Sequence, residues 1–231
     1  MTKNLSPAIA RAFGASLLAL SAIASASPIT STGGLTGSTT LIDFSQFTGA
    51  GQLQGVNGPT QIGSVAGVNV TVQDMSGGSN VWLYNAGWGL LGNGSWDSGM
   101  NGFLGIFPNN GPVRIRFNDG PISGFGAFMN YPVSGFLPQT LSAFDAAGNL
   151  LEAFDIGANA PISTPGGLNA GGFRGIQLAT TNIAYIEFLG DTAVFDNLRF
   201  STVGNSVPEP TSLALVGLAL AGLGLARRKQ A

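Results

Sequence analysis

The sequence predicts an all-β body, an antiparallel β-sandwich of jelly-roll type, between two apolar terminal segments. Three observations support this prediction. Short apolar runs repeat with a period of two residues, and turn-forming Gly, Pro, Asn and Asp residues separate most of them. The body also lacks an amphipathic pattern long enough for a helix of about ten residues. About ten short strands without a long helix favour two packed antiparallel sheets.

Alternation is clearest in two segments. Valines alternate with polar residues from 66 to 74, and Val113, Ile115 and Phe117 alternate with two arginines. Such a segment has one buried face and one wet face, because successive strand side chains point to opposite sides. Further strands are expected at 41–47, 122–129, 141–144, 150–156, 173–178, 183–189 and 194–200.

Turn chemistry separates most of these strands. Asn109–Pro112, Asn118–Pro121 and Asp145–Asn149 offer the left-handed or proline-fixed positions that chain reversals need. We expect the last of them to close a hairpin between two neighbouring apolar runs. Segments 48–63 and 156–172 are rich in Gly, Pro, Asn and Ser, and we expect both to be surface loops.

The first 26 residues have the pattern of a secretory signal peptide. Lys3 and Arg11 supply a basic start, an apolar stretch follows from 12 to 24, and Ala24-Ser25-Ala26 forms a small-residue cleavage site. We predict cleavage after Ala26 by signal peptidase. A retained membrane anchor is the alternative interpretation of this stretch.

The body, residues 27–206, is long enough for one domain with its own core. It contains no lysine, and its four arginines stand against ten carboxylates, which gives a formal charge of −6. An acidic body repels phosphate backbones, so we expect no nucleic-acid partner. The chain has no cysteine, so stability must come from packing or bound metal without disulfides. The four arginines are Arg114, Arg116, Arg174 and Arg199.

The C-terminal segment, residues 207–231, combines three parts in a fixed order. Val207-Pro208-Glu209-Pro210 comes first, an apolar stretch at 211–226 follows, and Arg227, Arg228 and Lys229 form a basic cluster. As a helix, that stretch would span about 24 Å, which is short for a stable membrane anchor. The cations would keep its end in the cytoplasm, while the two prolines keep the preceding segment extended.

This order of parts resembles the PEP-CTERM sorting signal. The resemblance implies an exported protein with a transient membrane helix at 211–226, whose Pro-Glu-Pro segment an exosortase recognises and cleaves. It also implies a final place at the cell surface or in the extracellular matrix. A buried core helix is the alternative for the apolar stretch, although core helices seldom end a chain with three cations.

All three tryptophans lie between residues 82 and 96, among glycines and polar side chains. We expect Trp96 to be the most exposed of them. Flat aromatic rings beside amide and carboxyl groups suit sugar binding, so a carbohydrate platform is one hypothesis. The alternative is that Trp82 and Trp88 fill the core, as large aromatics commonly do. The candidate carbohydrate-binding residues are Trp88, Asn93, Trp96 and Asp97.

Segment 191–200 resembles the closing strand common in PEP-CTERM proteins, with an Asp-Asn pair before an alternating apolar run. Asp196 and Asn197 could donate oxygen ligands to Ca²⁺. The alternative, which we favour, is that Asp196 accepts backbone hydrogen bonds or pairs with Arg199 at a strand edge. We expect no cofactor other than this possible metal.

We expect no enzymatic activity. The chain has no His and no Cys, which excludes catalytic triads, thiol nucleophiles and His-based zinc sites. Only carboxylate chemistry stays open, and a glycosidase would need two carboxyl groups across a cleft. The candidate carboxylates, none in a diagnostic motif, are Asp145, Glu152, Asp155 and Glu187.

Three functions therefore remain open. The first is a structural surface or matrix protein associated with extracellular polysaccharide, for which a weakly charged surface also suggests self-association. The second is a carbohydrate-binding module, and the third is a carboxylate-dependent glycan hydrolase or lyase.

Overall fold

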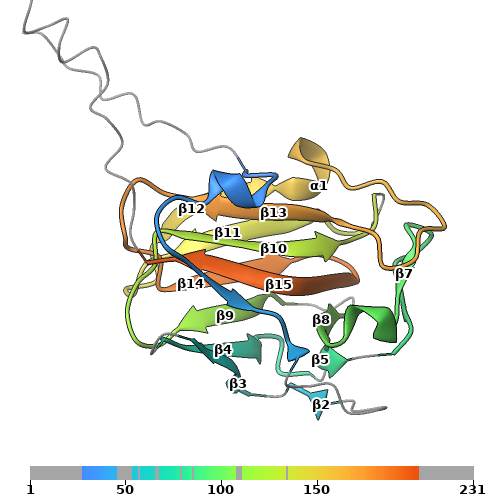
Figure 1. The fold of residues 1–231 in the computed structure, drawn as a ribbon, viewed down its shortest axis with the longest axis horizontal. Coiled ribbons are helices and arrows are strands. Elements are labelled where there is room, and N and C mark those ends of the chain that lie inside the picture. Colours follow the sequence, from blue (N-terminus) through green and yellow to red (C-terminus); the bar gives the residue numbers. More distant parts are fainter. Residues whose placement is uncertain are drawn as a thin grey trace, which may run out of the picture.

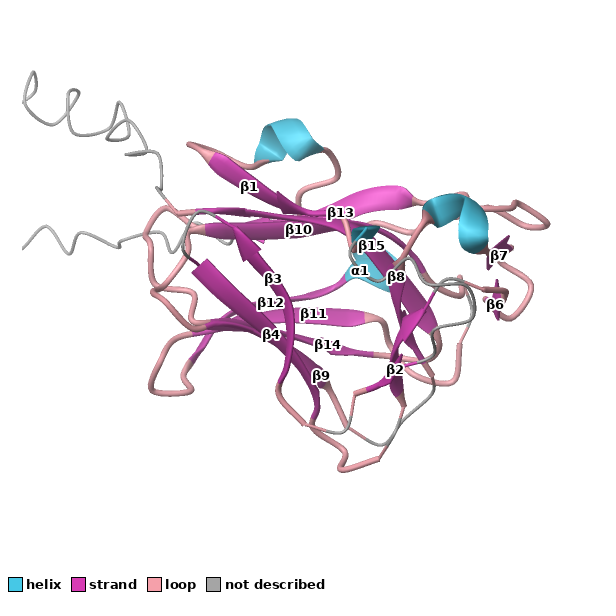
Figure 2. Ribbon diagram, turned by 60° about the horizontal axis from the view of Figure 1, so that its bottom comes forward, coloured by secondary structure: helices cyan, strands magenta, loops and turns pink. Residues whose placement is uncertain are grey.

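The computed structural model describes residues 28–45, 54–56, 58–65, 68–78, 80–84, 86–107, 111–133 and 135–202. The expected signal peptide and the C-terminal segment lie outside these residues. The described chain forms two packed sheets and a small outer hairpin (Figures 1 and 2). All pairings between its named strands are antiparallel.

Sheet I has seven strands, and the last strand of the sequence, β15, lies in its middle. Strand β15 pairs with β10 on one side, and with β8 and β1 in succession on the other. Its order is β13 (Gly172–Gln177), β10 (Gly124–Asn130), β15 (Ala193–Ser201), β8 (Phe103–Ile106), β5 (Val81–Tyr84) and β2 (Gln54–Gly55), with β1 (Thr39–Ile42) on β15.

Sheet II has six strands and faces sheet I across the core. Its order is β12 (Leu150–Asp155), β11 (Thr140–Phe144), β14 (Tyr185–Leu189), β9 (Val113–Phe117), β4 (Val68–Asp74) and β3 (Thr60–Val65). The outer hairpin joins β6 (Trp88–Gly89) to β7 (Ser95–Trp96). The described helices are short: η1 (Thr32–Gly34), η3 (Ser98–Met100) and α1 (Ile156–Asn159).

The last eight strands pair in a nested order. Strand β8 pairs with β15, β9 with β14, β10 with β13, and β11 with β12. The segment from β8 to β15 is thus one long hairpin of four strand pairs. It is rolled so that successive pairs fall in alternate sheets. This is the arrangement of a jelly roll and confirms the predicted sandwich.

One apolar cluster fills the space between the sheets. Phe188 of sheet II meets Phe195 of sheet I edge to face at 5.0 Å between ring centroids. Phe117 of sheet II likewise packs against Phe125 and Phe200 of sheet I, at 6.2 and 5.4 Å. These rings are almost completely buried. Burial of such side chains is the main favourable term in folding.

The predicted elements agree with the structure where alternation was strong. The segment predicted at 113–117 is β9, and the turn Asp145–Asn149 does close the β11–β12 hairpin, with Asp145 N donating to Asn149 O at 3.0 Å. Two expectations were wrong. The run at 41–47 leaves the strand after Ile42, because Phe44 turns at a φ of 55°. The expected loop at 48–63 contains β2 and the start of β3.

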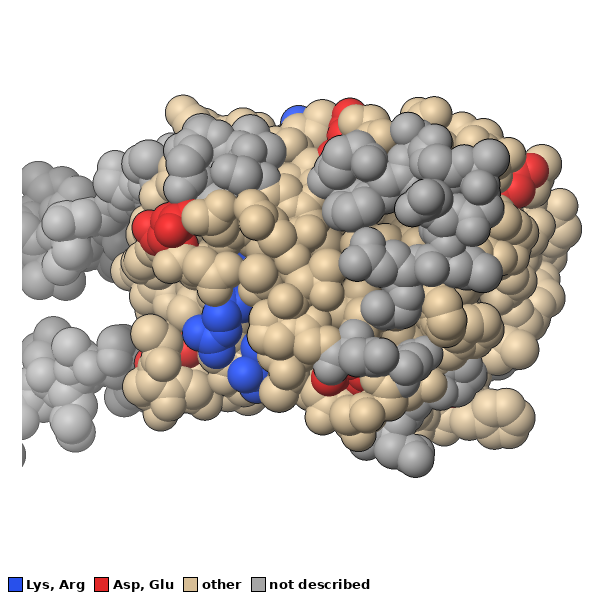
Figure 3. Space-filling model, turned by 90° about the horizontal axis from the view of Figure 1, so that it is seen from below, with Lys and Arg blue, Asp and Glu red and all other residues tan. Residues whose placement is uncertain are grey.

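Charged side chains are sparse on the surface. Figure 3 views the molecule from the side on which β3, β4 and β9 lie in Figure 1, and most described atoms there belong to uncharged residues. The one ion pair that the structure records among its described residues joins Arg114 to Glu187, with Nη2 and Oε1 2.6 Å apart. Salt bridges therefore contribute little to this fold.

Candidate functional site

The tryptophan region forms a second apolar cluster on the outer side of sheet I. The β6–β7 hairpin places Trp88 opposite Trp96 in the pairing register and packs both against Phe103 of β8. Neighbouring β5 and β10 add side chains to the same cluster. We call this the outer cluster, and its buried members are Trp88, Leu90, Trp96, Phe103 and Val194.

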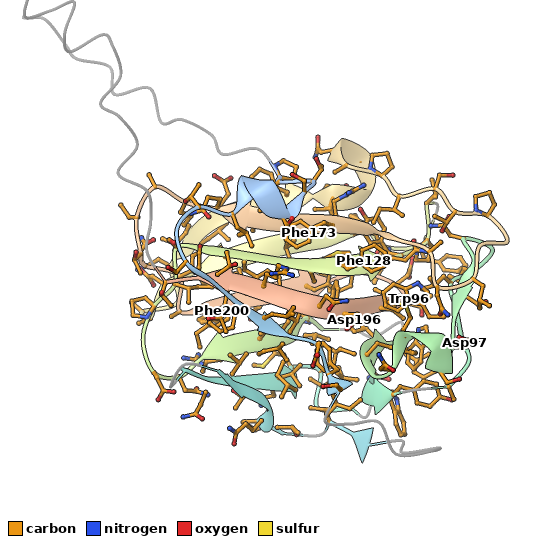
Figure 4. The ribbon with its side chains drawn as sticks, viewed as in Figure 1. Trp96, Asp97, Phe128, Phe173, Asp196 and Phe200 are labelled. Carbon is orange, nitrogen blue, oxygen red and sulfur yellow. The ribbon has the colours of Figure 1, made fainter. Side chains whose placement is uncertain are left out.

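Trp96 lies at the centre of this cluster, so the expectation that it is exposed was wrong. Its exposed fraction is 0%. The ring stacks on Phe128 at 5.7 Å and 17°, and its Nε1 donates to the carbonyl of Ala170 at 2.8 Å (Figure 4). The glycines around Trp96 misled the prediction, because they belong to loops that lie over the sheet.

Trp88 is also held from both sides. Its Nε1 donates to Thr192 Oγ1 at 2.9 Å, and its six-membered ring lies directly over Gly105 of β8. A Cβ at Gly105 would lie 2.7 Å from that ring. Trp88 and Trp96 therefore do not form an exposed platform. Core filling, the alternative considered for Trp88, describes it and also describes Trp96.

The polar neighbours of the tryptophans bind the loops of the protein itself. Asn93 Nδ2 donates to Asn130 Oδ1 at 3.0 Å, to Tyr131 O at 2.6 Å and to Ile162 O at 2.8 Å. Its Oδ1 accepts from Thr164 N at 2.7 Å. Asn93 therefore ties the hairpin to β10 and to the 156–172 loop.

Asp97 also links the β6–β7 hairpin region to the 156–172 loop. Its Oδ1 accepts from Asn169 Nδ2 at 2.7 Å and from Gly99 N at 2.9 Å, which caps η3. Hydrogen bonds from Asn169 and then Gly99 lower the pKa of Asp97. The two loops also pair through their backbones at Ser95 and Leu168. The four candidate sugar-binding residues thus share one region, where their polar groups stabilise loops.

An aromatic pocket of about 340 Å³ lies beside the outer cluster. Its described lining comprises Trp82, Tyr84, Gly87, Trp88, Gly89 and Phe107. Phe107 is 46% exposed and packs on Trp88 at 4.2 Å between ring centroids. Trp82 Nε1 is buried and has no hydrogen-bond partner among the described residues. The alternation of 81–84, with Trp82 and Tyr84 on one face, was the sequence signal that could have located this pocket.

The Asp196–Asn197 pair lies at a β-bulge in the middle of sheet I. The register of β10 against β15 shifts here, and Asn197 has a φ of 49°. Asn197 donates to the Asp196 carboxylate twice, from its backbone N at 2.6 Å and from Nδ2 at 3.0 Å. Burial, opposed by the Asn197 backbone hydrogen bond and assisted by nearby Asp43, raises the pKa of Asp196 to about 7.

This geometry supports the backbone role that we favoured for Asp196. β15 is a central strand and not an edge, and the structure records no ion pair between Asp196 and Arg199. Within the described ranges, no three acidic side chains gather as metal ligands. Calcium binding by Asp196 and Asn197 stays a prediction.

The candidate catalytic carboxylates Asp145, Asp155 and Glu187 have structural partners. Asp145 accepts from Asn149 N and Nδ2, both at 2.8 Å, within its hairpin turn. Asp155 caps α1 by accepting from Ala158 N at 2.9 Å. Glu187 pairs with Arg114. Glu152 lies on β12.

The end of β15 leads into the last distinctive segment of the chain. Ser201 closes β15, and Val207 follows six residues after it. Residues 206–229 match the family described as the PEP-CTERM protein-sorting motif. The chain carries a PEP-CTERM tail. This confirms the resemblance seen at 207–231.

The PEP-CTERM tail indicates an exported protein that is anchored transiently in the membrane and processed by an exosortase. The match covers the tail alone, so the subfamily of the body is unassigned. No curated protein and no solved structure matches the chain. Among the described residues no helix is long and apolar enough to span a membrane, and the tail lies outside them.

Proposed function

We propose that the body is a structural protein of the cell surface or extracellular matrix, associated with exopolysaccharide. The observation that supports this proposal is the PEP-CTERM tail, which directs export and release from the membrane. The body fits such a role, because the polar side chains that were candidates for a binding or catalytic site stabilise its own loops and turns. These side chains are Asn93, Asp97, Asp145 and Asp155.

Exposed apolar residues support self-association as part of this role. Phe136 is 94% exposed in the loop before β11, and Val133 and Leu137 in the same loop are also exposed. An apolar loop of this kind gains free energy when a second molecule covers it. Few charges oppose such contacts on the faces described above.

A carbohydrate-binding module is the second candidate, and the aromatic pocket favours it. Trp82, Tyr84 and Phe107 provide ring surface for the C–H face of a sugar. This replaces the expected Trp88–Trp96 platform by a neighbouring surface. Replacement of Trp82 by Ala should weaken sugar binding at this pocket, because it removes ring surface.

We propose no catalytic role for the body. Asp145, Asp155 and Glu187 each have the structural partner described above, and a hydrolase or lyase would need a pair of carboxyl groups facing one substrate bond. Product release from polysaccharide by the purified full chain would overturn this proposal.

The proposed function is tested by following the full chain in its own cells, with and without the exosortase. We expect a shortened form in the extracellular polysaccharide fraction of normal cells, and an uncleaved form in the membrane fraction without exosortase. A Pro208→Ala, Glu209→Ala double variant should behave as the uncleaved form does. A shortened protein that leaves the cells free of polysaccharide would contradict the matrix role.

A further inference from the structure

A second pocket, of about 570 Å³, lies at the end of sheet II where three turns meet. It is shallow and open, and its size lies in the usual range for ligand sites. The turn after β9, the turn of the β11–β12 hairpin and the segment before β14 supply its walls. Its polar side chains are Arg116, Asn118, Asp145, Thr181 and Asn182, and Pro121 and Ala146 add apolar surface.

Arg116 in this pocket differs from its neighbour Arg114 in one respect. Both guanidinium groups lie over the Tyr185 ring, at 4.8 and 4.2 Å from its centroid. Arg114 donates from Nε and Nη2 to Glu187 Oε1, at 2.9 and 2.6 Å. The Arg116 guanidinium has no hydrogen bond and no ion pair in the part of the chain that the structure describes. Its guanidinium therefore keeps all its donors for a ligand.

The Tyr185 ring beneath the Arg116 guanidinium fixes the orientation of that group. Tyr185 is nearly buried and stacks on Phe144 with centroids 4.9 Å apart and planes at 10°. A guanidinium held over such a ring keeps its fork in one orientation. Arg116 thus presents a preorganised cation to the pocket, which lowers the entropy cost of binding.

The opposite wall offers groups suited to hydroxyls. Asp145 lines the pocket without pairing with Arg116. Hydrogen bonds from the Asn149 side chain and backbone lower the pKa of Asp145, so it is ionised at neutral pH. Asn182 Oδ1 accepts from Thr180, whereas its Nδ2 donates to no described residue. One cation, one separate carboxylate and one free amide donor thus share this pocket.

We propose that this pocket binds a carboxylate-bearing sugar residue of an acidic polysaccharide. The sugar carboxylate meets the Arg116 fork, and its hydroxyls bind Asp145 and Asn182. A uronic acid carries these groups on one ring, so it fits better than a neutral sugar or a simple anion. The inference deepens the proposed association with exopolysaccharide and rests on it.

The charge distribution favours this assignment. The body carries a formal charge of −6, so most of its surface repels an acidic polymer. Arg114 and Arg116 are neighbours on one face of β9, and in Figure 3 the Arg atoms visible on this side of the molecule gather mainly in one patch. Because Arg114 is paired with Glu187, Arg116 is the cation that a carboxylate of an acidic chain would meet at this end of sheet II.

The test compares two soluble polysaccharides as probes of the full chain, purified in detergent. Polygalacturonate supplies uronic acid residues, and dextran supplies neutral sugar residues. We expect polygalacturonate to bind and dextran not to bind. We also expect Arg116→Gln to weaken binding about ten- to hundredfold, as loss of a charged hydrogen-bonding partner does. Arg116→Lys should restore part of it, because the charge returns without the fork.

Arg199→Gln is the matched control, since it removes the same charge from the other sheet. It should bind polygalacturonate as the unaltered chain does, and a shared melting temperature would show that each variant is folded. Equal binding by Arg116→Gln, equal loss in Arg199→Gln, or equal affinity for dextran would each overturn the assignment. Absence of binding would also overturn it, while localisation in producing cells would still decide the matrix role.

Discussion

The two apolar clusters of this protein are built by different means. The core between the sheets consists mainly of apolar side chains on the inward-facing positions of the strands. The outer cluster is formed by a hairpin laid over sheet I, and hydrogen bonds from Trp88, Trp96 and Asn93 to distant residues fix its position. Burial drives both, and the outer cluster in addition depends on these hydrogen bonds to hold its hairpin in one place on the sheet.

Removal of the Trp96 ring tests whether the outer cluster is part of the global fold. Trp96→Ala should lower the free energy of unfolding by about 3–5 kcal/mol, as expected for a buried aromatic. Phe195→Ala in the core should cost a similar amount, because both rings are equally buried. Urea unfolding measures both. A loss below about 1 kcal/mol for Trp96→Ala would show that the outer cluster unfolds separately.

The pH dependence of stability tests the role of the buried Asp196 carboxylate in sheet I. The folded pKa of Asp196, about 7, lies above its ordinary value of 3.8, so folding favours the protonated form. Its contribution is therefore most favourable at low pH and is lost as pH rises from about 4 to about 7. Asp196→Asn should be more stable than the unaltered protein at pH 8, and the difference should shrink toward pH 4. Thermal unfolding at several pH values measures this, and a pH-independent difference would contradict it.

Overpacking under Trp88 tests how closely the hairpin fits the sheet. Gly105→Ala places a methyl group against the Trp88 ring and should cost about 1–3 kcal/mol. Gly89→Ala is the control, because a Cβ there meets no atom within 4 Å. Chemical denaturation of both variants gives the comparison. If they proved equally stable, the ring would be free to move.

Loss of the Asn93 side chain tests the polar contacts alone. Asn93→Ala leaves buried carbonyls of Tyr131 and Ile162 without this donor, at a cost of about 1–3 kcal/mol. Its effect should concentrate in the 156–172 loop, so amide hydrogen exchange there should rise more than in β9. Uniform acceleration over both segments would show that Asn93 supports the whole fold.

The sandwich was predictable because its strands carry their own signal. Alternation at 113–117 identified β9, and turn residues identified the hairpin that is the innermost pair of the jelly roll. The outer cluster was not predictable in this way. Trp96 lies in a two-residue strand among glycines, and its burial depends on Phe128 and Ala170, which are remote in sequence.

The pocket that contains Arg116 could likewise be predicted only in part from the sequence. Alternation placed Arg114 and Arg116 on one wet face of a strand, as the structure confirms. Which arginine is paired depends on the register of β14, which sets Glu187 opposite Arg114 and Tyr185 opposite Arg116. A shift of one residue would place the carboxylate on the other face of the sheet.

The central position of β15 has a consequence for the order of events during export. Sheet I needs β15 to join β1, β8 and β10, so it is complete only after Ser201 has left the export channel. Val207 follows six residues later, a reach of at most about 20 Å. The strand that completes sheet I and the segment that an exosortase recognises are therefore separated by only a short stretch of chain.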